Sequence, residues 1–212
     1  CFFGVNGASG LIQSAVIAMA NPGENILMPR NVHISVIKIC AMQNINPIFF
    51  DLEYSTETGH YKPITKIWLE NVFKKLNFDE NKIAGVILVN PSYHGYAGDL
   101  EPLIDCCHQK NLPVLVDEAH GSYFLFCENL NLPKPALSSN ADLVVNSLHK
   151  SLNGLTQTAV LWYKGNLIIE DNLIKSINLL QTTSPSSLLL SSCEESIRDW
   201  LNKKSLSKYQ KR

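Results

Sequence analysis

The chain lacks the segments that mark membrane and secreted proteins. Its 212 residues contain no apolar run of about 18 residues, which a membrane-spanning helix needs, and no basic segment followed by a short apolar stretch. These absences favour a soluble, cytoplasmic protein with no membrane partner. The chain also has no initiator methionine and opens on the apolar run Cys1-Phe2-Phe3. We therefore expect it to be a segment of a longer polypeptide.

Charge and cysteine are also sparse. Charged residues make up 17% of the chain and the formal net charge is −1, so no generally basic surface indicates a nucleic-acid partner. The six cysteines form no CxxC pair, which favours buried, reduced thiols over a disulfide framework. Cys107 and His108 have no second ligand pair at zinc-like spacing, so no metal is expected. The hydrophobic content of 45% predicts an ordinary folded core.

The chain has no glycine followed by lysine, and this decides how its most conspicuous motif is interpreted. The stretch VLVDEAHG (Val114 to Gly121) contains the DEAH box of nucleic-acid helicases, whose acids hold magnesium on ATP. A helicase also needs a phosphate loop ending in Gly-Lys upstream of the box, and none is present. The segment Ser147-Leu148-His149 does not match the helicase Ser-Ala-Thr motif either. Asp117, at the end of an apolar strand, is therefore expected to do different work.

Short apolar strands alternate with amphipathic stretches along nearly the whole chain. This pattern predicts an α/β fold of three layers (α/β/α), with a mainly parallel sheet covered on both faces. Strands are predicted at Phe2–Val5, Asn25–Met28, Pro47–Asp51, Ile83–Val89, Pro113–Val116, Leu143–Ser147 and Gln157–Tyr163. Helices are predicted at Leu11–Ala20, Ser35–Gln43, Ile64–Leu76, Pro102–Lys110, Leu173–Leu180 and Leu188–Leu201. Loops are predicted at Glu53–Lys62 and Asn131–Ser139, and a basic tail at Asn202–Arg212.

A glycine-rich turn, GVNGASG (Gly4 to Gly10), joins the first strand to the first helix. Its spacing is GxxGxxG instead of the GxGxxG of dinucleotide-binding folds, and the second strand ends in Pro29-Arg30 instead of an acid. Arg30 leaves NADP open as an alternative cofactor. The turn favours an anion at the start of the helix, held by Ser9 and by unpaired backbone N–H groups. A plain tight turn with Ser9 as the N-cap is the alternative interpretation.

Four polar segments follow strands of the predicted sheet, at Asn6–Gly10, Arg30–His33, Asp117–His120 and Ser147–Lys150. Ligands gather at the carboxyl ends of strands in such sheets, so we expect these segments to converge. A lysine facing a crevice there loses solvation, which lowers its amine pKa and makes it a Schiff-base nucleophile. An anion-binding turn, an aspartate for a ring nitrogen and a lysine for an aldehyde are the parts that hold pyridoxal phosphate.

With these residues in place, the sequence resembles the Orn/Lys/Arg decarboxylase family of fold-type I pyridoxal-phosphate enzymes, which have the aspartate-aminotransferase fold. The resemblance extends from residue 1 to about residue 190. The matching segments are VNGASG, PRNVHISV, ILVNPSYHGYAGDL, VLVDEAHGSYF, ADLVVNSLHKSLNGLTQTAVL and LLQTTSPSSLLL.

The resemblance implies a catalytic set of three residues. Lys150 would carry the cofactor aldehyde as a Schiff base, Asp117 would pair with the pyridine nitrogen, and His33 would stack on the ring and assist proton transfer at Cα. The other residues implied to bind the cofactor are Ser9, Gly10, Ala119, His120, Ser147 and His149. Asn90 and Ser92 are expected nearby.

The sequence departs from the family pattern in two places. Ala8-Ser9-Gly10 stands where the family usually has Thr-Ser-Thr, so two hydroxyls on the phosphate side are missing. His94 stands where an aromatic residue is often found. The resemblance also divides the chain into a large cofactor-binding domain (residues 1–190) and a C-terminal helix and basic tail (residues 191–212). An N-terminal segment and a C-terminal small domain of the family are absent.

The activity implied is decarboxylation of arginine, lysine or ornithine to the amine and CO₂, in polyamine metabolism. A homodimer or higher homo-oligomer is implied too, with Thr182–Ser187 contributing across subunits. Two alternatives stay open. The chain could be another fold-type I enzyme, such as an aminotransferase or lyase, or a truncated remnant without activity.

Overall fold

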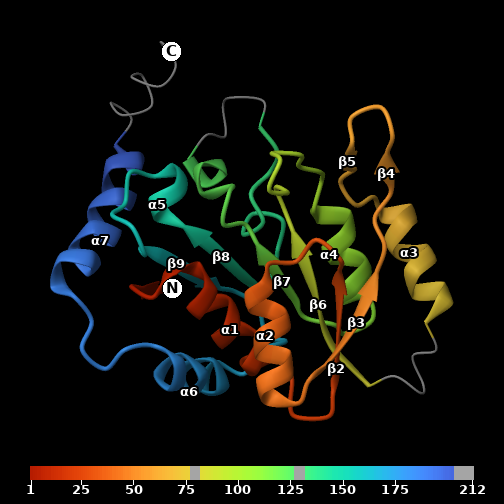
Figure 1. The fold of residues 1–212 in the computed structure, drawn as a ribbon, viewed down its shortest axis with the longest axis horizontal. Helices are drawn as coiled ribbons and strands as arrows, with labels where there is room; N and C mark the ends of the chain where they lie inside the picture. The colour runs from red at the N-terminus through yellow and green to blue at the C-terminus, as the bar shows by residue number, and fades with distance from the viewer. Residues whose placement is uncertain (77–81, 127–131, 203–212) are drawn as a thin grey trace.

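A seven-stranded sheet forms the centre of the protein in the computed structural model, which describes residues 1–76, 82–126 and 132–202 (Figure 1). The strand order is β1-β9-β8-β7-β6-β2-β3. Within this sheet β9 is antiparallel to both of its neighbours, and the remaining pairs are parallel. The strands are β1 (Phe2–Gly4), β2 (Asn25–Pro29), β3 (Asn46–Phe50), β6 (Ile83–Val89), β7 (Val114–Asp117), β8 (Leu143–Ser147) and β9 (Ala159–Tyr163).

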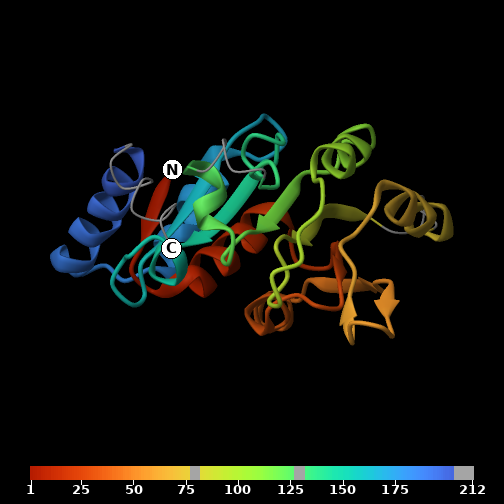
Figure 2. The ribbon, with the colours of Figure 1, turned by 90° about the horizontal axis from the view of Figure 1, so that it is seen from above.

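Helices cover both faces of the sheet, which confirms the predicted α/β class and its three layers (Figure 2). On one face, α1 (Gly7–Met19) contacts both α2 (Ile34–Gln43) and α6 (Glu170–Leu180). On the other face, α3 (Lys66–Lys75) contacts α4 (Glu101–His108). The remaining helices are α5 (Leu148–Ser151), α7 (Ser187–Leu201) and the 3₁₀ turn η1 (Ser122–Phe126).

Alternation along the central strands creates two cores. Leu115 and Val145 face α1, whereas Val116 and Val144 face the layer of α3 and α4, and all four side chains are fully buried. Burying such a side chain contributes about 1.5–3 kcal/mol, so both faces of these strands are held firmly. The same alternation continues into the polar residues after β7 and β8 and decides which of them face the cavity described below.

Several element boundaries differ from the predictions. The predicted loop Glu53–Lys62 contains a small hairpin of β4 (Tyr54–Ser55) and β5 (His60–Tyr61). A two-residue strand is too short for a periodicity signal, which explains the miss. The predicted loop Asn131–Ser139 is irregular where it is described, but it buries Ala136 and Ser139.

The C-terminal part of the chain is only partly described. Helix α7 runs across residue 190, and residues 203–212 of the predicted basic tail lie outside the described residues. The division into residues 1–190 and 191–212 stays a prediction. None of the described helices combines the length and the apolar character that crossing a bilayer requires.

Candidate active site

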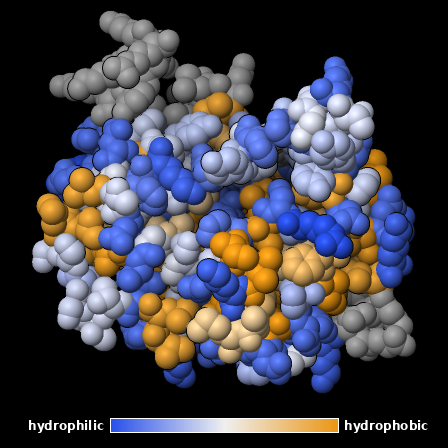
Figure 3. Space-filling model, viewed as in Figure 1, coloured by the Kyte–Doolittle hydropathy of each residue, from blue (hydrophilic) through white to orange (hydrophobic). Residues whose placement is uncertain are grey.

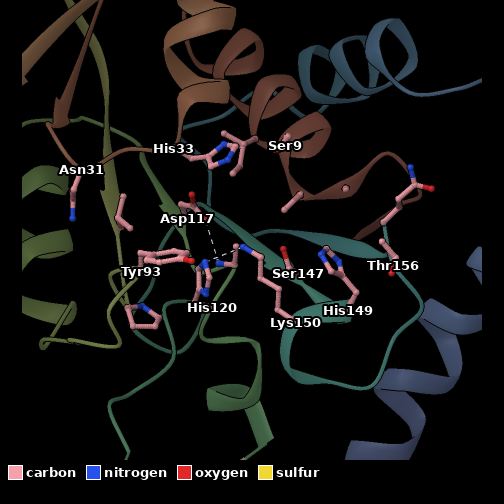
Figure 4. A pocket seen from close by; sticks show the side chains of 17 residues that line it. Ser9, Asn31, His33, Tyr93, Asp117, His120, Ser147, His149, Lys150 and Thr156 are labelled. Atoms are coloured by element: carbon pink, nitrogen blue, oxygen red, sulfur yellow. Dashed lines mark hydrogen bonds between the residues drawn. The ribbon is translucent and has the colours of Figure 1, made fainter.

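The four polar segments meet at one edge of the sheet, as the sequence predicts. They follow β1, β2, β7 and β8, whose carboxyl ends point the same way because β1 and β8 are both antiparallel to β9. A cavity of about 340 Å³ opens there, lined by residues from all four segments. Figure 4 shows the Lys150 side chain pointing toward His120. Ser9 and Ser147 do not lie on the His120 side of the lysine.

Asp117 ends β7 and lines the cavity with 7% of its surface exposed. Its Oδ1 accepts a hydrogen bond from the Ala119 backbone N–H at 3.1 Å. Burial raises the pKa of this carboxyl, while the Ala119 N–H, Lys150 and His33 act in the opposite direction. A cationic ring nitrogen placed against Asp117 would compensate the cost of burying its charge. The buried Ala119 also lines the cavity, so its methyl group can contact a ring.

Lys150 lies in α5, the single helical turn that follows β8. Its Nζ is 2.9 Å from Nε2 of His120. Partial burial lowers the pKa of the Lys150 amine, against the opposing charge of Asp117. Burial also lowers the pKa of His120, and Lys150 and His33 lower it further. A neutral His120 therefore accepts a hydrogen bond from the Lys150 ammonium group.

The start of α1 and Ser147 line the part of the cavity where the sequence predicts an anion. Helix α1 begins at Gly7, four residues before the predicted start, so Ser9 lies inside its first turn and is not the N-cap. The Gly7 N–H donates to the Gln157 carbonyl at 2.9 Å. The next two N–H groups, of Ala8 and Ser9, have no partner within the helix.

Of the residues that the resemblance assigns to catalysis or cofactor binding, Gly10 alone does not line the cavity. Helix geometry pairs its N–H with the Asn6 carbonyl, so that group is not available to a ligand. A Cβ atom at Gly10 would lie 2.8 Å from Nε2 of Gln181, which is the far end of a flexible side chain. The contact between the Gly10 N–H and the cofactor stays a prediction that this helix geometry does not favour, because α1 begins earlier than expected.

Ser147 has no exposed surface, and its Oγ has no hydrogen-bond partner although it lines the cavity. A buried hydroxyl without a partner is costly and indicates a polar group that belongs there. The Oδ1 atom of Asn31, also in the lining, is buried and unpartnered in the same way.

Two further histidines line the cavity in defined tautomers. His33 caps α2, and its Nδ1 accepts the Ser35 N–H at 3.2 Å, so a neutral ring carries its proton on Nε2. His149 Nδ1 is 3.0 Å from the Thr158 carbonyl, so this nitrogen carries the proton and Nε2 is left as an acceptor.

Several lining residues had no individual role predicted from the sequence, among them Asn31, Tyr93 and Thr156. All three lie inside the quoted segments, so motif membership was the available signal. Asn90 and Ser92 do not line the cavity. Asn90 Oδ1 instead accepts the Gly98 N–H at 2.9 Å, and Ser92 Oγ accepts the Tyr96 N–H at 3.2 Å, so both shape the loop that presents Tyr93. His94, beside Tyr93, stacks on His60 with ring centroids 4.1 Å apart.

Residues 1–208 match the family model of the Orn/Lys/Arg decarboxylase major domain. The chain belongs to this family. Arginine decarboxylases of Bacillus cereus and Bacillus subtilis are both 37% identical to the chain over 193 residues. Each alignment covers 91% of the chain, with 41% of the first relative and 38% of the second. The chain thus spans about two fifths of the length of these curated relatives.

Solved structures show the same fold. The E. coli constitutive lysine decarboxylase matches with a TM-score of 0.76 at 21% identity, over 92% of this chain and 28% of that one. A Bacillus subtilis ureidoglycine–glyoxylate aminotransferase matches with a TM-score of 0.74 at 13% identity, over 99% and 55%. A variant of serine palmitoyltransferase from S. paucimobilis, with a bound PLP–myriocin aldimine, matches with a TM-score of 0.68 at 16% identity, over 94% and 48%.

Pyridoxal 5′-phosphate is the cofactor of this family of decarboxylases. The residues around the cavity fit it on the structure's own terms. The unpartnered Ser147 hydroxyl and the first N–H groups of α1 suit a phosphate. The buried carboxyl of Asp117 suits a cationic ring nitrogen, and the Lys150 amine suits an aldehyde.

Proposed function

We propose that this chain is the cofactor-binding part of a decarboxylase that converts arginine, lysine or ornithine into the corresponding amine and CO₂. The observation that carries the proposal is the convergence of Lys150, Asp117 and the unpartnered Ser147 hydroxyl on one cavity. The family and the arginine decarboxylase relatives support the reaction class. The other fold-type I activities use the same cofactor and differ in their products.

Each of these residues has a separate task in the proposed site. Ser147 Oγ and the N–H groups of Ala8 and Ser9 bind the phosphate. Asp117 would hold a proton on the ring nitrogen, and the Ala119 methyl group would contact the ring. When bound, pyridoxal phosphate supplies an aldehyde that joins to amines and a ring that accepts electrons.

Lys150, His120 and His33 are the groups that exchange or hold protons in the proposed reaction. Burial lowers the pKa of Lys150, so its amine loses a proton more readily than that of an exposed lysine. His120 accepts a hydrogen bond from this amine and holds it in the cavity. In its imidazolium form, His33 would donate Nδ1–H to Ser35 Oγ, 2.8 Å away, and could give its Nε2 proton to the substrate Cα after CO₂ has left, which returns the ring to the neutral form.

The lining leaves the distal cation of a basic substrate without a partner. Among the described lining residues Asp117 is the sole carboxylate, and it is assigned to the ring nitrogen. We propose that the group recognising this cation comes from the remainder of the longer polypeptide or from a second copy of the chain. This division of labour agrees with the short span of the chain relative to its relatives.

The test begins with absorbance of the purified chain mixed with pyridoxal phosphate, followed by borohydride and peptide mapping. We expect a visible band and a stable label on Lys150, both lost in Lys150→Ala. CO₂ release from carboxyl-labelled arginine, lysine and ornithine then tests the reaction in the chain and in the longer polypeptide. A folded chain that forms no band contradicts the proposal. A labelled Lys150 with an amine-transfer product and no CO₂ favours an aminotransferase instead.

A further inference from the structure

Glu118, the second residue of the DEAH segment, faces away from the cavity and has no role in the proposed reaction. It follows Asp117 directly, and alternation turns its side chain toward the α3 and α4 face of the sheet. The side chain has no exposed surface. A buried carboxyl is costly unless its oxygens are paired, so its position calls for a structural reason.

Hydrogen bonds pair every polar atom of this residue's side chain. Oε1 accepts the Ala136 backbone N–H at 2.9 Å, and Oε2 accepts Nδ2 of Asn146 at 3.1 Å. The same Asn146 Nδ2 also donates to the Glu118 backbone carbonyl at 3.0 Å. Asn146 Oδ1 accepts the Trp162 Nε1–H at 2.8 Å, so both polar atoms of the amide are engaged. The set Glu118, Asn146 and Trp162, with the Ala136 N–H, is called the Glu118 clamp below.

The clamp ties together the two strand ends that carry the site. Glu118 is the neighbour of Asp117 at the end of β7, and Asn146 is the neighbour of Ser147 at the end of β8. The Glu118 backbone N–H also donates to the Val145 carbonyl at 3.0 Å. Within the described residues, the Asp117 side chain accepts one hydrogen bond, from the Ala119 N–H, so its direction depends on the backbone that the clamp holds.

We infer that Glu118 is a positioning residue, which fixes the ends of β7 and β8 so that Asp117 and Ser147 face one ligand at the spacing it needs. The inference rests on the proposed role of these two residues at the cofactor. Rigid support of the residues that contact a ligand commonly decides how well a site works.

Asp142 supplies a matched control. It is a buried carboxylate at the opposite end of the same two strands, where its Oδ2 accepts the Val114 N–H and pairs with His108, both at 2.8 Å. Asp142→Asn therefore weakens the β7–β8 pairing away from the cavity. Trp162→Phe is a milder change to the clamp, because it removes the donor to Asn146 and keeps an aromatic ring.

The experiment measures the Kd for pyridoxal phosphate and the pH dependence of the bound cofactor's visible spectrum, alongside urea unfolding. In Glu118→Gln we expect the Kd to rise by about tenfold. Effects of this size are known for residues that orient the ligand-contacting side chains without touching the ligand. The midpoint of the spectral pH titration also shifts, because Asp117 is less well aligned with the ring. Trp162→Phe gives a smaller change in the same direction, and Asp142→Asn changes the unfolding midpoint alone.

Two results overturn the inference. One is a Glu118→Gln variant with the wild-type Kd and spectral titration, and the other is an equal effect of Asp142→Asn. Failure of the wild-type chain to bind the cofactor defeats the proposed function instead. Amide hydrogen exchange in the cofactor-free chain then tests whether the Glu118 clamp holds the backbone after β7. Faster exchange from residues 118 to 121 in Glu118→Gln than in Asp142→Asn supports it, and equal exchange overturns it.

Discussion

The Nζ atom of Lys150 lies 2.9 Å from Nε2 of His120, although the two residues follow different strands of the sheet. His120 belongs to the turn after β7 and Lys150 to the helical turn after β8. A neutral imidazole that accepts from an ammonium group holds the lysine over the cavity without adding charge to it. Burial lowers the pKa of both groups, which favours the form of each that the proposed chemistry uses.

The reactivity of Lys150 should depend on the charge of Asp117. Burial lowers the pKa of the amine, and the Asp117 carboxylate raises it. Asp117→Asn removes the opposing charge, so we expect the amine to react with pyridoxal phosphate at lower pH than in the wild-type chain. The pH profile of the initial rate of labelling checks this. A profile that moves to higher pH contradicts the assigned sign, and free lysine in the same buffer is the control.

Substitutions of Asp117 and of Ser147 are expected to change different quantities, kcat for the first and the Kd for the cofactor for the second. In the proposed reaction Asp117 acts where charge develops, so Asp117→Asn should lower kcat by roughly 10²–10³-fold with a modest change in cofactor affinity. Ser147→Ala removes one phosphate contact, worth about 1–3 kcal/mol, and should weaken the Kd for the cofactor while saturated turnover is largely kept. Steady-state kinetics at saturating and limiting cofactor separate the two. Equal effects on kcat would contradict the roles proposed here.

Glu118 should give the protein a pH-dependent stability. Burial raises the pKa of this carboxyl from 4.5 to about 7, against the hydrogen bonds from Ala136 and Asn146. The folded state therefore keeps a proton that the unfolded chain releases, and this stabilisation is complete below pH 4.5 and is lost as the pH rises through about 7. The loss is on the order of 3 kcal/mol in the free energy of unfolding.

Urea unfolding at pH 5 and pH 8 checks this expectation. The wild-type chain should lose more stability over this interval than Glu118→Gln, whose side chain does not titrate. The same pH dependence in both proteins would show that another group is responsible.

The described cysteines should divide into one reactive and four protected thiols. Cys1 is exposed, contrary to the prediction of buried thiols, whereas Cys40, Cys106, Cys107 and Cys193 are buried. Burial raises the pKa of all four, to about 11 for Cys40, so at pH 8 roughly one Cys40 thiol in a thousand is ionised. Iodoacetamide labelling with peptide mapping should therefore modify Cys1 in the native chain and the others after unfolding. Rapid native labelling of Cys40 would contradict the packing around it.

Apolar side chains on the outer helices favour self-association. Figure 3 shows hydrophobic surface over α6 and α7 on the viewed face. Leu179 of α6 and Leu188 of α7 are largely exposed. The segment Thr182–Ser187, which the family resemblance implicates in a subunit contact, connects these helices. We expect light scattering to show a dimer or larger oligomer, weakened by Leu179→Glu or Leu188→Glu and kept in Ile67→Glu, an equally exposed position on α3. A monomer at micromolar concentration would contradict the expectation.

Much of the fold and the site follows from local sequence. Continuous apolar runs such as Ile83–Val89 predict buried strands, because a strand covered on both faces has no polar side. The order of motifs placed Lys150, Asp117 and Ser147 at strand ends, and the parallel arrangement brought them together. The second strand ends in Pro29-Arg30 instead of an acid, which argued against a dinucleotide-binding fold. In the structure, Arg30 forms an ion pair with Asp51.

The tertiary structure alone decided which neighbouring residues face the ligand. The start of α1 at Gly7 removed Gly10 from the cavity, because a shift in the helix start changes which N–H groups are unpaired. The clamp at Glu118 could not be seen from the motif, since its partners Ala136, Asn146 and Trp162 lie on other segments. Sequence patterns report the period of each element, whereas hydrogen bonds between distant segments depend on how the elements are packed together.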